Sequence, residues 1–483
     1  MCVYTMAIGI ASAAIYSILT PIAQATNLTL DELNTGTGYM FLAFGWGCLV
    51  FQPIAQQYGK RPTYLFSLLA TMCIMIWAPF TTTNGQWIAN KVLQGLVGAP
   101  IESLCEISVS DIYFTHERGT YMGVYALFLT SSNFVAPLIA GFINDGQGWQ
   151  WVLYWCAIFC GIGFVVCFFL MEETNYHRST PIQGEPIEAE TAMEVSKTSD
   201  PEKTPAADSM SPAPSTRESN MGQSQKSFVQ KMALFKRGDL TKKNMMKGMV
   251  LRPLIFLTFP VIFTAGFMYG SILCYFNILN GTTSLILSST PYNFSSSMVG
   301  LTYIATLLGS ATGSYYSGPL GDKFVLWKAR RNGGIREPEH RLWLYVMPLL
   351  IVPSGLLLWG VGAAHNVHWF GLVVAMYMLG TCIAVGCQIP VAYCIDSYSD
   401  FGADGVVTVI IVRNTMSFAI GYGITPWVTN MGYQNAFLVA AFAALVVISG
   451  FLVFIKFGKG FRRNSTQRYL KYIKQREEDG LAH

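Results

Sequence analysis

Twelve long apolar runs constrain this chain more than any other feature of its sequence. Each run holds about 20 residues, the length that a helix needs to cross a hydrocarbon core about 30 Å thick. Runs this long and continuous favour helices over barrel strands. We therefore expect an all-α polytopic membrane protein with 12 transmembrane helices. The runs cover 4–22, 38–55, 64–80, 86–112, 121–143, 149–171, 253–279, 294–320, 342–363, 367–397, 405–427 and 434–456.

Basic residues gather on one side of the predicted membrane. Of the 31 Lys and Arg residues, 29 fall in the loops and tail of that side when Lys456, the last residue of the final run, is counted with the tail, and only Lys91 and Arg413 lie within runs. The positive-inside rule places both termini and the long central loop in the cytoplasm, and we expect the plasma membrane as the location. Since this asymmetry explains the basic balance, we expect no nucleic-acid partner.

The runs form two groups of six around a polar loop. We expect an N-terminal six-helix half at 1–171, a cytoplasmic linker at 172–252, a C-terminal six-helix half at 253–456 and a basic cytoplasmic tail at 457–483. The linker is rich in Pro, Ser, Thr and Glu, so we expect it to be largely disordered to about residue 230. Repeated halves with a site at their interface are a common transporter design.

Three acids interrupt the fourth run, in "GAPIESLCEISVSD". Glu102 and Glu106 are four residues apart and share a helix face, whereas Asp111 lies nearly opposite. Two carboxylates one turn apart repel each other when both are ionised, so we expect one to hold a proton. The pair is a candidate proton carrier or cation anchor. The alternative is a structural pair, tied by hydrogen bonds to neighbouring helices.

Several motifs resemble one family. "YGKRP" after the second run, "KVLQGLVGA" in the fourth and "DIYFTHERGTYMG" after it resemble the major facilitator superfamily, and within it the fungal twelve-span drug:proton antiporters. "ARRNGGIREPEHRLW" and "VIIVRNTMSFAIGYGITPW" resemble a fungal branch that includes permeases for polyamines and related organic cations. The resemblance implies two pseudo-symmetric six-helix halves that rock around a midplane site. It also implies a monomer in the lipid bilayer that handles protons and a small-molecule substrate.

Further site residues follow from the resemblance, because the first, fourth, seventh and tenth spans of the family line its cavity. Lys91 and Gln94 match its R-x-x-Q-G motif, with Lys in place of the Arg that is linked to proton coupling. A lysine that extends to the membrane interface is the alternative. In the seventh and tenth spans, the candidates to bind an ammonium substrate or to pack the helices are Tyr269, Tyr275, Asn277 and Gln388.

A gating role is implied for the loop after the second run. "QPIAQQYGKRP" keeps the Gly and the basic pair of the family's G-x-x-x-D-x-x-G-R-R/K motif, but lacks its first Gly and its Asp. In the family this loop latches the two halves, partly through an acid that ends the fourth span. Asp111 fits that acid, with Lys60 or Arg61 as its partner. The second half keeps the motif's Asp as Asp322. Loop stabilisation by surface charge is the alternative.

Arg413 stands near the middle of the eleventh run, where a lone cation needs a partner. The available acids of the same half are Asp322 and Asp396, and the latter is the counterpart of Asp111. We expect Arg413 to form a structural ion pair with one of them, and substrate contact is the alternative.

The sequence carries no enzyme signature, and its six His are dispersed without metal-ligand spacing, so we expect no enzyme, metal or cofactor. The preferred function is a proton-coupled secondary transporter of small organic cations, such as polyamines or cationic drugs. One alternative exports neutral drugs or other small metabolites by proton antiport. Another keeps the fold as a sensor that does not transport and signals through its central loop. The direction of transport stays open.

Overall fold

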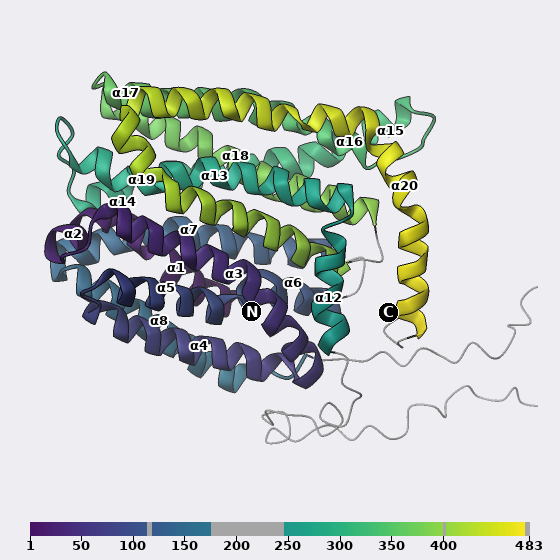
Figure 1. The fold of residues 1–483 in the computed structure, drawn as a ribbon, viewed down its shortest axis with the longest axis horizontal. Coiled ribbons are helices and arrows are strands. Elements are labelled where there is room, and N and C mark those ends of the chain that lie inside the picture. The colour runs from purple at the N-terminus through teal and green to yellow at the C-terminus, as the bar shows by residue number, and fades with distance from the viewer. Residues whose placement is uncertain (114–117, 175–245, 399–401, 479–483) are drawn as a thin grey trace, which may run out of the picture. The chain divides into compact units, whose positions relative to one another are not determined.

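The computed structural model describes residues 1–113, 118–174, 246–398 and 402–478. Within these ranges the regular elements are helices, without a β-strand (Figure 1). The predicted all-α class is confirmed. Residues 175–245, which include the part of the linker expected to be disordered, lie outside the described residues.

The six spans of the first half contain breaks that the sequence explains. The first span bends by 67° between η1 and α2. In the fourth span α5 ends before Pro100, whose missing N–H cannot continue the helix but is tolerated at the first position of α6. The elements are α1 (Cys2–Ala13), η1 (Ala14–Ser17), α2 (Leu19–Ala25), α3 (Leu30–Tyr58), α4 (Lys60–Trp77), η2 (Ala78–Phe80), α5 (Asn84–Gly98), α6 (Pro100–Ile112), α7 (Arg118–Gln147) and α8 (Trp149–Leu170).

The second half repeats this plan with its own breaks. Gly432, at φ 75°, interrupts α19 between the eleventh and twelfth predicted spans, a conformation that glycine adopts without strain. The elements are α12 (Met246–Phe256), α13 (Pro260–Ser288), α14 (Ser296–Tyr315), the π-helical turn η4 (Tyr316–Leu320), α15 (Gly321–Arg331), α16 (Glu339–Leu342), η5 (Trp343–Tyr345), α17 (Val346–Ala364), α18 (Trp369–Ser397), α19 (Gly402–Ser449) and α20 (Phe451–Glu478).

Each predicted run corresponds to a helical segment. By length and composition, nine segments of the described ranges can cross a membrane, or ten when the bent first pair counts as one span. The last of them, Asp404–Lys474, contains two predicted spans, and α14 with η4 matches the eighth. The bundle has one end where α8 ends and α12 begins, which we call the linker end.

Two helix pairs hold the halves together. α3 packs along α19, and α7 packs along α14. In span order these are the second with the eleventh and the fifth with the eighth. Shifting each span by six positions exchanges the two pairs, which is the pattern expected for pseudo-symmetric halves.

Glycine permits the close approach of α7 and α14. A Cβ on Gly141 would lie 2.2 Å from the carbonyl oxygen of Ser296, and one on Gly300 would lie 2.7 Å from that of Pro137. Nearby, Asn144 Nδ2 donates a hydrogen bond to Ser296 Oγ at 3.0 Å. Small residues let membrane helices pack backbone to backbone, where dispersion contacts replace the missing hydrophobic drive.

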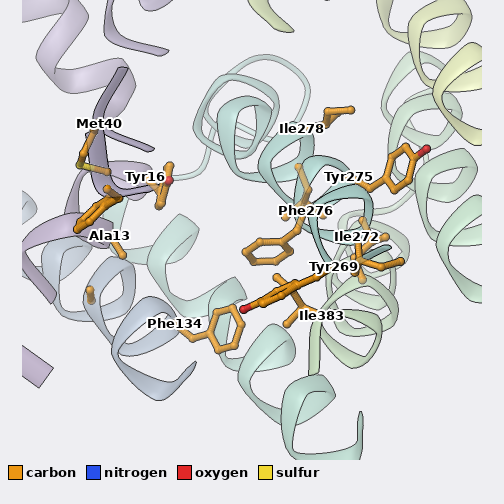
Figure 2. Packing of buried hydrophobic residues seen from close by; sticks show 14 of the residues in the cluster. Ala13, Tyr16, Met40, Phe134, Tyr269, Ile272, Tyr275, Phe276, Ile278 and Ile383 are labelled. Carbon is orange, nitrogen blue, oxygen red and sulfur yellow. The ribbon is translucent and has the colours of Figure 1, made fainter. Parts of the chain in front are cut away.

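Aromatic packing joins the first half to α13. Phe134 of α7 meets Phe276 of α13 edge to face, with ring centroids 5.7 Å apart. Figure 2 shows both rings beside Tyr269 and Ile383, in the apolar layer between the halves.

The predicted tail is helical in the part that the structure describes. α20 crosses the linker end near α12 and α16 (Figure 1). Tyr472 donates a hydrogen bond to Asp404 at 2.9 Å, and the hydroxyls of Tyr398 and Ser465 lie 2.8 Å apart. These contacts tie the helix to the second half.

The glycine contact gives a stability prediction with an internal control. Gly141→Ala should lower the free energy of unfolding by about 1–3 kcal/mol, because the added methyl group overlaps backbone atoms of α14. Gly123→Ala on the same helix meets no atom within 4 Å, so it should leave stability equal or higher. Thermal unfolding in detergent measures both. A Gly141→Ala variant as stable as the control would contradict the close packing.

Candidate functional site

An ion pair between the two halves forms the centre of the candidate site. Glu102 of α6 pairs with Arg413 of α19, and Asn414 Nδ2 donates to the same carboxylate at 3.3 Å. The Glu102 side chain is 15% exposed and that of Arg413 is 9% exposed. Since buried charges are costly unless paired, each stabilises the other at this depth.

Tyr269 holds Arg413 from the second half. Arg413 Nη1 donates to the Tyr269 hydroxyl at 2.6 Å, and the guanidinium lies 4.6 Å from the ring centroid. Gly270 lets α13 approach closely, because a Cβ there would lie 3.0 Å from the Cα of Arg413. The guanidinium is thereby fixed between a carboxylate of one half and a phenol of the other.

The expected partner of Arg413 was wrong. Asp322 and Asp396 pair with Arg341, at 3.2 and 3.4 Å, and Asp396 also pairs with Arg336 at 3.2 Å. Those acids lie at the linker end, whereas Arg413 lies 11 residues along α19, roughly 16 Å deeper at 1.5 Å per residue. Because α19 packs against the first half, its cation meets an acid of that half instead.

Glu106 lies one turn beyond Glu102 and is half-buried. Among the described residues it has no hydrogen-bond or ion-pair partner. It is close enough to interact electrostatically with Cys48 and Tyr125 of the first half and with Tyr269 and Cys387 of the second. An ionised carboxylate in these surroundings is costly until a proton or a cation neutralises it.

Asp111, the third acid of α6, has a different environment. It pairs with Lys60, whose side chain is only 1% exposed, at the linker end of the first half. The backbone N–H groups of Lys60 and Arg61 donate to the Glu173 carboxylate at 3.0 and 3.1 Å, and Arg61 Nη2 donates to the Phe168 carbonyl at 2.7 Å. This cluster joins α4, α6 and α8 of one half.

Lys91 and Gln94 are buried inside the first half. Lys91 Nζ donates to Gln94 Oε1 at 2.8 Å and lies 4.6 Å from the Trp87 ring centroid. Gln94 Nε2 donates to the Ala11 carbonyl at 3.0 Å. These contacts connect α5 with α1, and none of them reaches Glu102 or the second half.

The other predicted residues of the seventh and tenth spans do not gather around Glu106. Tyr275 points to the opposite side of α13 from Tyr269 (Figure 2). Gln388 is hydrogen-bonded to Ser317 and to Ser314 within the second half. Asn277 borders a separate cavity of about 20 Å³, the size of a water site, and its Nδ2 is buried without a partner. Of the predicted residues in these two spans, Tyr269 is the one that contacts the Glu102–Arg413 pair, through Arg413.

Several contact residues escaped prediction. Asn414 was visible beside Arg413, and Glu173 was visible as an acid at the end of the sixth run. Arg336 and Arg341 stood in the quoted "ARRNGGIREPEHRLW". Their partners lie 19 to 312 residues away along the chain, so spacing carried no signal for the pairs. Within the described ranges, no group of three or more His, Cys, Asp or Glu could hold a metal ion.

Comparisons with known proteins agree with this architecture. A family model described as Major Facilitator Superfamily matches residues 1–412. An uncharacterised MFS-type transporter of Schizosaccharomyces pombe is 27% identical over 470 residues, covering 93% of this chain and 81% of its own length. Protein HOL1 of Saccharomyces cerevisiae is 26% identical over 493 residues, which cover 93% of this chain and 83% of the length of HOL1.

Solved structures show the same fold at low identity. A D-xylose–proton symporter superposes with a TM-score of 0.58 at 10% identity, covering 93% of this chain and 95% of its own. The family match, the helical spans and this likeness together place the chain among multi-pass membrane transporters rather than enzymes. The chain belongs to the major facilitator superfamily.

Proposed function

We propose that this transporter is a proton-coupled carrier of small organic cations, such as polyamines or cationic drugs, and that it works by alternating access. The observation that carries the proposal is Glu106, a carboxylate between the halves without a protein counter-charge in the described part of the chain. Glu106 interacts electrostatically with Tyr125 and Tyr269, and aromatic rings suit an ammonium group through cation–π attraction, as the Tyr269 ring already shows with Arg413.

Charge balance supports one-for-one exchange. Glu102 and Arg413 neutralise each other, which leaves the site with the single negative charge of Glu106. A proton or one ammonium group completes the balance, and each excludes the other because both need the same carboxylate. Competition of this kind makes the carrier an antiporter, in which the cation enters the site as the proton leaves. The imposed gradients then decide the direction of net flux.

Contacts between the halves support a conformation closed at the end opposite the linker. Hydrogen bonds join the halves there, among them Thr20 to Ser284 at 2.9 Å, Asn34 to Thr425 at 3.0 Å and Asn144 to Ser296 at 3.0 Å. At the linker end, the pair of Lys60 and Asp111 lies within the first half, and the pairs of Arg336, Arg341, Lys459 and Arg462 lie within the second. We assign the linker end to the cytoplasm by the positive-inside rule and favour the plasma membrane.

The linker-end ion pairs fit a gating role within this cycle. Lys60 with Asp111 braces the first half, and Arg341 with Asp322 and Asp396 braces the second. Each set holds a loop in place while the halves separate. Lys91 and Gln94, which are packed between α5 and α1, would influence coupling by setting the position of the fourth span.

Glu106 gives the direct test of function. Glu106→Gln should reduce cation flux at least about tenfold, since a neutral amide provides no counter-charge, a loss of roughly 1.4 kcal/mol or more. Glu106→Asp keeps the charge and serves as the matched control. The measurement is entry of labelled spermidine and of a monovalent cationic drug into proteoliposomes with a pH gradient of either sign. An acidic lumen should drive entry.

Wild-type flux in Glu106→Gln, or no counterflow of any cation by the wild-type protein that binds it, would refute the proposal. The second outcome would favour the sensor interpretation. Cation flux that does not respond to the pH gradient would refute the proton coupling but not the cation transport.

The ion pair between the halves gives a second prediction. Glu102→Gln and Arg413→Gln each leave one buried charge unpaired and should destabilise the protein by about 3–5 kcal/mol. The double variant removes both charges and should recover most of that loss. Thermal unfolding of the three proteins in one detergent measures the coupling. Additive losses in the double variant would show that the two side chains do not depend on each other.

A further inference from the structure

A second site lies at the linker end of the second half, away from the carboxylates. α15, α16 and η5 enclose a groove of about 450 Å³. Its walls include the indoles of Trp327 and Trp343, the cations of Lys328 and Arg331, and the imidazole of His340. None of these residues takes part in the proposed transport cycle.

The two cations of the groove are held by aromatic rings. Lys328 Nζ lies 3.9 Å from the Trp343 ring centroid, and Arg331 Cζ lies 4.0 Å from that of Trp327. Within the described residues no carboxylate forms an ion pair with either cation. Cation–π contact positions a side chain but leaves its N–H donors unused. The groove thus presents two positive charges with open donors.

The acid nearest to the groove is already engaged. Glu337 Oε1 accepts from Lys459 Nζ at 2.6 Å and from Asn332 Nδ2 at 3.0 Å. The Lys459 hydrogen bond holds the pKa of Glu337 below its usual value, so this carboxyl stays charged but directed to α20. Glu337 attracts Lys328 electrostatically, but it forms no ion pair with Lys328 or Arg331 in the part of the chain that the structure describes.

His340 supplies an independent sign of a ligand. The residue is 6% exposed, and its Nδ1 is buried without a hydrogen-bond partner, while its Nε2 faces Glu337 at 3.8 Å. Buried polar atoms are rarely left unpaired, and since His340 lines the groove, a ligand bound there is a candidate partner for its Nδ1. A phosphate oxygen can accept or donate there.

Apolar surface flanks the cationic groove. Trp327 is 47% exposed, Trp343 is 40% exposed and Leu326 is 53% exposed. Leu326 and Trp327 follow the eighth span and Trp343 lies at the start of the ninth, which places them at the level of lipid head groups. Tryptophan is enriched at that level, and basic pockets there bind anionic head groups.

We propose that this groove binds the head group of an anionic phospholipid. Lys328 and Arg331 hold the phosphate, His340 completes its hydrogen bonds, and the acyl chains lie along Trp327, Trp343 and Leu326. The shared chemistry is that of any phosphate, but the exposed indoles and leucine favour a lipid over free phosphate, which has no apolar part to bury.

Lipid titration followed by native mass spectrometry of the full chain in detergent tests the assignment. Lys328→Gln with Arg331→Gln should weaken phosphatidylserine binding roughly 25-fold, about fivefold for each cation. The control removes two charges from the same helix outside the groove, as Lys323→Gln with Arg330→Gln, and should bind as the wild type does. Lys328→Arg with Arg331→Lys keeps both charges and should retain most of the affinity.

Three outcomes would overturn the proposal. Equal losses in the groove and control variants would indicate a diffuse basic surface. Equal binding of phosphatidylcholine and phosphatidylserine by the wild type would show that the groove does not select an anionic head group. Inorganic phosphate that displaces the lipid at the concentrations at which phosphatidylserine binds would identify free phosphate as the ligand.

Discussion

The ion pair of Glu102 and Arg413 is the interaction on which the account of this transporter depends. It joins a helix of each half at a depth where water offers no compensation, so each charge requires the other. Tyr269 and Asn414 add one hydrogen bond each to the pair. Helix α6 carries two deep carboxylates, but among the described residues Arg413 is the one cation that pairs with them, and it pairs with Glu102. Glu106 therefore has no counter-charge in that part of the chain. The unpaired state of Glu106 follows from the pairing of Arg413 with Glu102.

The remaining charges follow a different rule. At the linker end, Lys60 with Asp111, and Arg341 with Asp322 and Asp396, each close within one half. Such pairs hold the loops of a half without linking it to the other. At the opposite end, hydrogen bonds link the halves mostly through neutral side chains, such as Asn34 and Thr425, and the Asp145 carboxylate accepts one from the Ser297 N–H. Neutral contacts cost less to separate than buried charges, which suits an end that has to open and close.

Sequence reasoning reached the fold and the position of the acids, but not the pairs across the bundle. Apolar run length reports spans, and helical spacing separates Glu106 from Asp111, because both are local properties. Arg413 shows the limit: its depth was readable, but the acid it meets depends on α19 packing against α3 of the other half. Lys91 was weighed as an interfacial lysine, whereas Trp87 and Gln94 bury it. The contacts of Glu173 could not be predicted, because they depend on backbone N–H groups that the turn between α3 and α4 brings together only in the folded chain.

The central claim is that a substrate cation and a proton compete for Glu106. Calorimetric titration of spermidine into the purified transporter, repeated in buffers of different ionisation enthalpy, measures the protons released on binding. The account predicts that the wild-type protein releases a proton as the cation binds, and that Glu106→Gln releases none. Binding to the wild type with no proton release, or an unchanged release in Glu106→Gln, would contradict it.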